Sequence, residues 1–491
     1  MLNPRSWLKQ RILRAVAAQR DERRRQLGQE RGLPPQSWGA SVAHDGQLVI
    51  GGCTVGELAR TFGTPLYVID EHKLRRDCTG FLSAFSGFYP KVELGYSYKT
   101  NPLPGAIRVI HDCGALAEVI SHFELDLALK LGVRPDSIIF NGPAKTAEAI
   151  DLAVRSRVKL INIDGFDEID LLAASASKHQ VRQPVGVRVV TSVGWQAQFG
   201  LRLRNGDVRA AFDRLRQVPW LVPVGLHVHL GTGIKHAPTY LQAITEMLEF
   251  ARQLQRECNV QIDYFDFGGG FGVPTVQPFD QWDTRLMQNQ LPVGPVDVDA
   301  NPRIEDYARS ISDLLRGFYP GPHLPTIAFE PGRAISSGAQ SLLLEVLTIK
   351  RDHQGPTRVI LNGGKNYALA TEYEYHELLA ASRMDQPHTE RLNFYGPLCH
   401  PGDELFVQKA FPALVAGDLV SIMDAGAYFV PNQMNFSNPR PAAVLVSDGR
   451  ARLVRARESF DDIVRLDAQC DAALQEAAGS ASHRSREAMP Q

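Results

Sequence analysis

The feature that most constrains the fold is an alternation, between residues 64 and 332, of short apolar runs with longer segments of helical period. The runs are rich in β-branched and aromatic residues, as in buried strands. Eight such runs occur, at residues 92–99, 116–121, 137–142, 159–165, 185–190, 224–231, 264–270 and 326–332. Strands that are apolar on both faces and joined by helices pair in parallel, and eight of them close a barrel. The sequence therefore predicts an α/β fold with a (β/α)8 barrel of the TIM type.

The pattern changes after residue 335 to period-two runs separated by turns, which predicts a C-terminal antiparallel β domain. The long connection 273–324 is expected to hold an inserted loop before the last barrel helix. The predicted organisation is a basic N-terminal extension (1–37), a segment that contributes to the β domain (38–69), the barrel (70–335), the β domain (336–465) and a flexible tail (466–491).

Composition excludes several classes of protein. The 491 residues are 44% hydrophobic and carry a net charge of −1, which gives no field for nucleic acid and favours small molecules or further copies of the chain as partners. The six cysteines lack paired metal-ligand spacing, and this indicates a reducing, cytoplasmic setting. Because no apolar run reaches about 18 residues, we expect no membrane span.

The first 37 residues predict a basic amphipathic helix. Its apolar residues recur at helical spacing: Trp7, Leu8, Ile12, Leu13 and Val16. Such a helix is typical of a surface or partner anchor, an organelle-targeting peptide, or a solvated extension packed loosely on the body. We favour the extension, because Asp21 and Glu22 dilute the basic charge.

Chemically active residues follow the predicted strands. In a barrel of this type the active site lies at the carboxyl ends of the strands, so we expect these side chains to converge. They are Lys99, Ser121, Glu124, Asn141, Asp164, Arg188, His229, Thr232, residues 268–270, Glu330 and Arg333.

Lys99 is the candidate nucleophile among these residues. Enclosure should lower the pKa of its ammonium group and make the amine a nucleophile toward an aldehyde cofactor held as a Schiff base. Pyridoxal phosphate fits the other strand ends. Backbone N–H groups of residues 268–270, at the start of a following helix, would bind its phosphate. Glu330 would keep the pyridine nitrogen protonated, His229 would lie against the ring, and Arg188 would reach the phenolic oxygen.

Each of these features also has a simpler interpretation. The glycine run can be a tight turn, and Cys399 can be an inert buried thiol. His227 and His229 share one face of a strand and could suggest zinc, but no third ligand follows at a suitable spacing.

The motifs, taken in order, are nevertheless specific. They are YSYKTN, NGPAK, INIDG, GLHVHLGT, DFGGGFG, EPGR, GPLCHPGD and GDLVSIMDAGAY. This ordered set resembles the fold-type III pyridoxal-phosphate decarboxylases, the diaminopimelate and ornithine decarboxylase family, over roughly residues 45–465. The resemblance implies the two-domain architecture of alanine racemase and the decarboxylation of an amino acid with pyridoxal 5'-phosphate.

The resemblance also assigns roles to residues. Lys99, His229, Glu330 and Cys399 match catalytic positions, and Cys399 matches a cysteine that enters from a second subunit and donates a proton. The implied active unit is a homodimer with shared sites. The cofactor-binding positions are Lys99, Arg188, His229, Thr232, Gly268, Gly269, Gly270, Glu330, Gly332, Arg333 and Tyr428.

Three departures from the family pattern bear on the substrate. His400 follows Cys399 where the family has an acid, residues 362–379 lack the family's Arg-Pro-x-Leu-Tyr element, and His122 and Phe123 replace two glycines before Glu124. We place Glu124 and His400 at the substrate. We expect a substrate other than diaminopimelate, such as a carboxylate-bearing or acylated amino acid of a specialised or siderophore pathway, with His400 or Lys365 near a distal carboxylate.

Two other functions stay open. A racemase of the alanine type shares the barrel and the lysine. In those racemases an arginine usually contacts the pyridine nitrogen, whereas this chain has Glu330 at the matching position. The other is a homologue that binds pyridoxal phosphate, or a partner, without catalysis.

Overall fold

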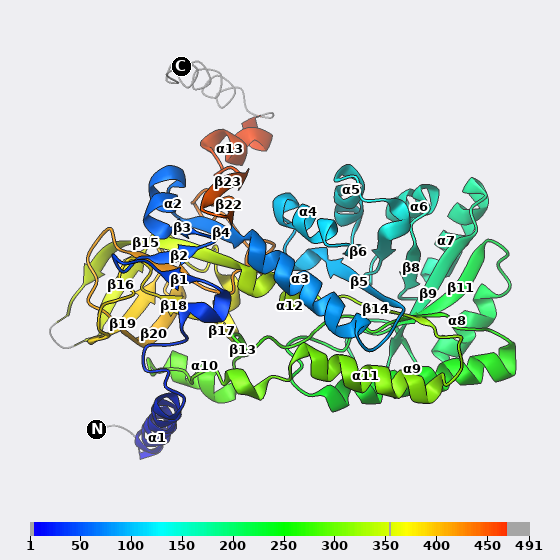
Figure 1. The fold of residues 1–491 in the computed structure, drawn as a ribbon, viewed down its shortest axis with the longest axis horizontal. Coiled ribbons are helices and arrows are strands. Elements are labelled where there is room, and N and C mark those ends of the chain that lie inside the picture. Colours follow the sequence, from blue (N-terminus) through cyan, green and yellow to red (C-terminus); the bar gives the residue numbers. More distant parts are fainter. Residues whose placement is uncertain (1–3, 353–354, 469–491) are drawn as a thin grey trace.

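The computed structural model describes residues 4–352 and 355–468, and its two large sheets differ in kind: the barrel and the sheet of a second domain beside it (Figure 1). The barrel is confirmed: its strands pair in parallel in sequence order, and a pairing of β8 with β9 completes the ring. They are β5 (Val92–Ser97), β6 (Leu116–Val119), β7 (Ile138–Phe140), β8 (Leu160–Ile163), β9 (Gln183–Val190), β11 (Leu221–His227), β12 (Tyr264–Asp266) and β14 (Thr326–Phe329).

Helices cover the outside of the barrel because each presents one apolar stripe to the strands. In the last of them, Tyr307, Ile311 and Leu315 recur at helical spacing and are buried. Side-chain caps start several of these helices, as where Asp70 accepts from the Lys73 N–H. The barrel helices are α3 (Glu71–Ser86), α4 (Pro104–Asp112), α5 (His122–Lys130), α6 (Ala147–Ser156), α7 (Asp167–His179), α8 (Asp207–Leu215), α9 (Ala237–Cys258) and α11 (Ile304–Phe318).

The second domain is built on β15 (Gln340–Lys350), which pairs antiparallel with its neighbours on both sides. One of them is β4 (Leu66–Asp70), so the chain contributes a strand here before it enters the barrel. The sheet is mixed rather than purely antiparallel, because β4 pairs parallel with β22 and β16 pairs parallel with β19. Its other strands are β16 (Thr357–Leu361), β18 (Leu378–Leu379), β19 (Glu390–Tyr395), β20 (Glu404–Phe411), β21 (Leu419–Ile422), β22 (Ala442–Ser447) and β23 (Arg450–Arg455).

The basic N-terminal segment forms α1 (Pro4–Gln26), which packs against the connection that precedes α11. Leu13 and Ala17 are buried against Leu286 of α10 (Gln281–Gln288), and Arg20 lies 2.7 Å from Asp280. The helix is therefore docked more firmly than the loosely packed extension that we expected. The connection itself is not only a loop, since it holds α10 and a short strand, β13 (Gln277–Pro278).

The remaining elements are short. A small sheet precedes the barrel, and β17 pairs with β13 across the two domains. None of the helices within 4–352 and 355–468 combines the length and the apolar character needed to cross a bilayer. The short elements are β1 (Ser41–Val42), β2 (Leu48–Ile50), β3 (Cys53–Thr54), α2 (Val55–Phe62), β10 (Leu201–Arg202), α12 (Arg333–Ser336), β17 (Glu374–Tyr375) and α13 (Phe460–Ala468).

Candidate active site

A cavity of about 410 Å³ lies at the carboxyl ends of the barrel strands and is closed on one side by residues of the second domain. Most of the side chains singled out from the sequence meet there, as expected for a barrel. Those that line it are Lys99, Asn141, Arg188, His227, His229, Thr232, Gly270, Glu330, Gly332, Arg333 and Tyr428.

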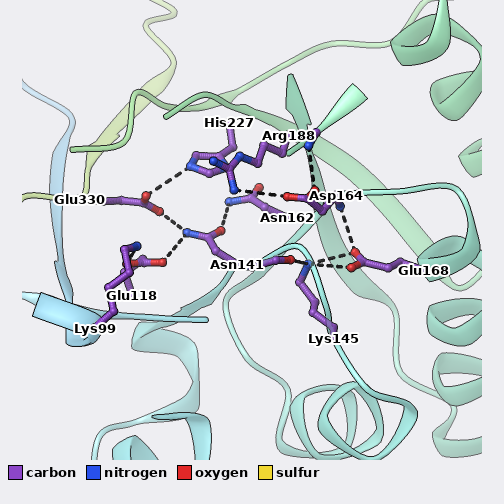
Figure 2. A network of polar contacts seen from close by, with 12 residues as sticks. Lys99, Glu118, Asn141, Lys145, Asn162, Asp164, Glu168, Arg188, His227 and Glu330 are labelled. Atoms are coloured by element: carbon purple, nitrogen blue, oxygen red, sulfur yellow. Dashed lines mark hydrogen bonds and ion pairs between the residues drawn. The ribbon is translucent and has the colours of Figure 1, made fainter. Parts of the chain in front are cut away.

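Lys99 is carried by the single turn Tyr98–Thr100 that follows β5, and its side chain is 31% exposed. Its Nζ lies 3.0 Å from Oε2 of Glu118, a fully buried residue of β6 (Figure 2). Burial alone would lower the pKa of Lys99, but the carboxylates of Glu118 and Glu330 outweigh it and raise the pKa. The expected lowered pKa is therefore wrong for this protein without cofactor, because enclosure brought two carboxylates with it.

Glu330 follows β14 and is held from two sides. Asn141 donates through Nδ2 to Glu330 and, at 3.0 Å, to Glu118, while His227 Nε2 lies 3.2 Å from Glu330 Oε2 (Figure 2). Burial would raise the pKa of Glu330, but the charge and hydrogen bond of His227 hold it below its ordinary value. The carboxylate is thus ionised and fixed in direction.

Asp266, at the end of β12, is a third member of this buried group. Burial, followed by the charge of Glu330, raises the pKa of Asp266 well above its ordinary value. One ligand atom each of His227, Asp266 and Glu330 lie within 4.8 Å of one another. The sequence offered no third ligand near His227, but the fold brings two carboxyl groups there. Hydrogen bonds within the group account for their closeness.

His229 lies just beyond β11 with its ring orientation fixed by the backbone. The N–H of Gly269 donates to its Nδ1 at 3.2 Å, so the ring proton resides on Nε2. Burial and then the charge of Lys99 lower the pKa of His229 to about 3, which leaves the imidazole neutral. The ring of Trp195 lies 5.7 Å from that of His229.

Arg188, on β9, points into the cavity under an aromatic ring. Its NH1 lies 3.3 Å from Asp164 Oδ2, and its guanidinium carbon lies 4.2 Å from the ring centre of Phe199. This stacking and pairing fix the guanidinium group in one plane.

The glycines form a close backbone cradle. A Cβ at Gly270 would overlap the carbonyl of Gly231, and one at Gly332 would overlap the hydroxyl of Thr100. Gly268 and Gly270 also have positive φ angles of 63° and 90°, which favour glycine. The expectation that a helix begins directly after this run is wrong, because the next elements are the short strand β13 and then α10, which begins at Gln281.

Arg333 and Tyr428 join the second domain to the barrel site. Both terminal nitrogens of Arg333 lie 2.9 Å from the carboxylate of Glu374, and its guanidinium group lies 5.3 Å from the Tyr428 ring centre. The Tyr428 N–H donates to the carbonyl of Thr100, next to Lys99, at 2.9 Å. The site is thus assembled from both domains.

Several predicted residues do not line this cavity. Of the glycine run, only Gly270 lines it, and Gly268 and Gly269 do not. Glu124 accepts from the Ile120 N–H at 2.8 Å, and burial, followed by Glu118, raises its pKa to about 7. Cys399 is exposed in the loop between β19 and β20.

His400 is exposed in the same loop. Lys365, which we placed near a distal carboxylate, is buried and lies 2.8 Å from Glu372, away from the cavity.

Sequence reasoning missed Glu118, His227 as a partner of Glu330, and Glu374. Glu118 did leave a signal, since it is a lone acid inside the apolar run LAEVIS. A charge in a strand buried on both faces requires a partner, and Lys99, on the turn that follows the neighbouring strand β5, is that partner. No comparable signal marks Glu374, whose partner lies in the other domain.

The chain is similar to known proteins over most of its length. Residues 72–337 match the family described as pyridoxal-dependent decarboxylase, pyridoxal binding domain. The chain is 31% identical over 447 residues to the diaminopimelate decarboxylase of Methanothermobacter thermautotrophicus, covering 86% of this chain and 96% of that one. The diaminopimelate decarboxylase of Actinosynnema pretiosum is also 31% identical, and the match covers 86% of this chain and 92% of that one.

The chain belongs to the pyridoxal-dependent decarboxylase family. Among solved structures, diaminopimelate decarboxylase from M. jannaschii in complex with L-lysine matches with a TM-score of 0.78 and 25% identity, over 87% of this chain and 97% of that one. This membership confirms the predicted two-domain architecture and makes the protein a pyridoxal-phosphate-dependent amino-acid decarboxylase of the diaminopimelate decarboxylase type.

Proposed function

We propose that Lys99 holds pyridoxal 5'-phosphate in this cavity and that the protein uses it to release carbon dioxide from an α-amino acid. The observation that carries the proposal is the convergence of Lys99, Glu330 and His229 on one cavity with a glycine cradle. An amine, a fixed carboxylate, a neutral imidazole and closely approachable backbone fit the aldehyde, pyridine nitrogen, ring face and phosphate of that cofactor.

The bound cofactor supplies an electron sink for the pair of electrons that the departing carboxylate leaves behind. Glu330 is held by Asn141 and His227, and as an ionised carboxylate it would keep a proton on the pyridine nitrogen. His229 would pack against the ring, and Arg188 would reach its phenolic oxygen. Thr232, Gly270, Arg333 and Tyr428 would hold the phosphate.

The proton that replaces carbon dioxide comes from Cys399 of a second copy of the chain. Cys399 and His400 are exposed and lie outside the cavity of their own chain, so each is accessible to another subunit. The active unit is then a homodimer in which His400 also reaches the substrate. Size-exclusion chromatography with light scattering, and mixing of Lys99→Ala with Cys399→Ala subunits to restore one working site, test this part.

The substrate differs from meso-diaminopimelate. The family's Arg-Pro-x-Leu-Tyr element is absent from residues 362–379, and an acid, Glu374, lines the cavity from this segment. An assay of carbon dioxide release from a panel of diamino and acylated amino acids tests this statement, and robust turnover of meso-diaminopimelate would contradict it.

The central experiment distinguishes three functions: a decarboxylase, a racemase, and a carrier that binds pyridoxal phosphate without catalysis. Purified protein should take up pyridoxal 5'-phosphate, show an absorbance band near about 420 nm, and release carbon dioxide from an amino acid. Inversion of the α-carbon without gas release would indicate a racemase, and the band without either reaction would indicate a carrier. Protein that stays colourless would overturn the proposal.

A further inference from the structure

Every lysine and arginine that lines the cavity already has a carboxylate partner in the described part of the chain. Lys99 lies 3.0 Å from Glu118, and the corresponding distance from Arg188 to Asp164 is 3.3 Å. Arg333 is the third cation, and Glu374 contacts both of its terminal nitrogens at 2.9 Å. A substrate with a free carboxylate on its side chain therefore finds no unpaired cation contributed by this chain.

The pair of Arg333 and Glu374 is a built arrangement rather than a surface contact. Glu374 is 3% exposed, and its Oε1 also lies 3.2 Å from Nε2 of His376, whose Nδ1 faces the carbonyl of Met423 at 3.1 Å. Burial would raise the pKa of Glu374, but His376 and Arg333 outweigh it and lower the pKa. Glu374 thus occupies the paired N–H groups with which an arginine binds a carboxylate.

The carboxylates of the barrel offer no better partner to a substrate whose side chain ends in a cation. The carboxylates of Glu118 and Glu330 are both bonded, to Lys99 and Asn141 in one case and to Asn141 and His227 in the other. Neither is available to a substrate ammonium group.

The outer wall of the cavity is aromatic instead. Trp195 and Tyr373 line it although they are 47% and 45% exposed, and the Trp195 and Phe199 rings stack with centres 6.0 Å apart. Large aromatic rings exposed at the rim of a cavity offer apolar surface to a ligand.

We propose that the substrate is an α-amino acid with an uncharged side-chain end, an amide, ester or other acyl group that packs against Trp195 and Tyr373, and that Glu374 excludes a second free carboxylate by occupying Arg333. This inference rests on the proposed function, because it concerns the substrate of the same site. It favours the acylated class over the carboxylate-bearing class among the substrates expected from the sequence.

The experiment compares amino acids of matched length that differ only at the end of the side chain. The full-length protein loaded with pyridoxal phosphate is assayed for carbon dioxide release from L-glutamate, L-glutamine and L-glutamate γ-methyl ester, and from meso-diaminopimelate, L-lysine and Nε-acetyl-L-lysine. We expect kcat/KM in at least one series to be tenfold or more higher for the uncharged member. A charged member preferred in both series would overturn the inference while leaving the proposed function in place, whereas no gas from any amino acid and no uptake of pyridoxal phosphate would contradict both.

A variant tests the role of Glu374 directly. Glu374→Gln removes a negative charge from the cavity wall and leaves Arg333, beside the proposed phosphate position, without its carboxylate partner. It should shift the kcat/KM ratio of L-glutamate to L-glutamine about tenfold toward L-glutamate, and Glu374→Asp should shift it less. The control is Glu372→Gln, two residues away, whose side chain is 64% exposed and lies outside the cavity. An unchanged ratio in Glu374→Gln, or the same shift in the control, would overturn the role.

Discussion

Two lysines near the same end of the barrel, Lys99 and Lys145, are both paired with a glutamate, yet their surroundings are opposite. Lys145 has no exposed side-chain surface and is held by the Gly142 carbonyl at 2.8 Å and by Glu168 at 2.9 Å (Figure 2). Its burial outweighs Glu168 and lowers the pKa of Lys145. Lys99 is 31% exposed to a cavity, and there two carboxylates outweigh burial and raise the pKa.

The comparison teaches that a buried lysine with a lowered pKa does not by itself mark a reactive site. Lys145 satisfies the electrostatic criterion that we applied to Lys99 from the sequence, but it lines no described cavity. Lys99 has what a nucleophile needs besides basicity, namely room for a ligand, a carboxylate across the cavity and close backbone. Access and neighbours, rather than enclosure, distinguish the two.

Replacing Lys99 should have the largest effect. Lys99→Ala removes the amine that we propose to hold the cofactor, so carbon dioxide release should fall by at least about 1,000-fold. The melting temperature should also fall, because the variant leaves the fully buried Glu118 without its cation. A variant that keeps more than a tenth of the wild-type kcat would break the distinction between the two lysines.

Lys145→Met should act on stability instead. It leaves Glu168 buried without its cation, which should lower the free energy of unfolding by about 3–5 kcal/mol, measured by urea denaturation. Adding Glu168→Gln should recover much of that loss. A stable Lys145→Met variant that no longer binds pyridoxal phosphate would reverse the two assignments.

Removing one carboxylate should bring Lys99 closer to Lys145 in basicity. Glu118→Gln keeps an oxygen acceptor but removes the nearest negative charge, so the pKa of Lys99 should fall. For a fall of one unit, the neutral amine at pH 8 becomes about tenfold more abundant. Stopped-flow absorbance of pyridoxal phosphate binding to the apoprotein measures the rate, and a slower reaction than wild type would contradict the assigned role of Glu118.

Glu124 tests how far the charge of Glu118 extends in the barrel. The pKa of Glu124 is about 7 in the folded protein, above the value of about 4.3 in an unfolded chain, so the folded state binds more protons between these values. Its contribution to the free energy of unfolding therefore falls as the pH rises from 5 to 8. Glu124→Gln should gain about 2 kcal/mol relative to wild type over this range. Parallel pH profiles of the two proteins would show that Glu124 is not perturbed.

A third lysine, Lys130, should have the smallest effect on the free energy of unfolding. Lys130 pairs with Asp126 on the surface of α5, and its side chain is 74% exposed. Lys130→Ala should change the free energy of unfolding by less than about 0.5 kcal/mol. A loss comparable to that of Lys145→Met would mean that burial does not separate these pairs.

The barrel and most of the residues at its strand ends were predictable because they depend on local patterns. Apolar runs such as LAEVIS mark strands, and parallel strands bring Lys99, His229 and Glu330 to one end. The pKa of Lys99 was not predictable in the same way, since it depends on which neighbouring strand positions carry acids.

Contacts between segments that are distant in the sequence could not be predicted either. The contact of Arg333 with Glu374 spans two domains, and α1 docks on α10 through residues that only the fold brings together. The glycine run predicted backbone N–H groups at the start of a helix, but no helix follows it directly, and the close approach of Gly270 to the Gly231 carbonyl appears only in the fold. Local pattern placed the groups, whereas their pairing required the tertiary structure.

The most direct test of the account is to reduce the protein with borohydride after incubation with pyridoxal 5'-phosphate and to locate the label by peptide mass spectrometry. We predict a single pyridoxyl group on the peptide that contains Lys99, at close to one per chain, with Lys145 unlabelled. A label on Lys145 or another lysine, or no stoichiometric label, would contradict the central claim that access and neighbours make Lys99 the reactive amine.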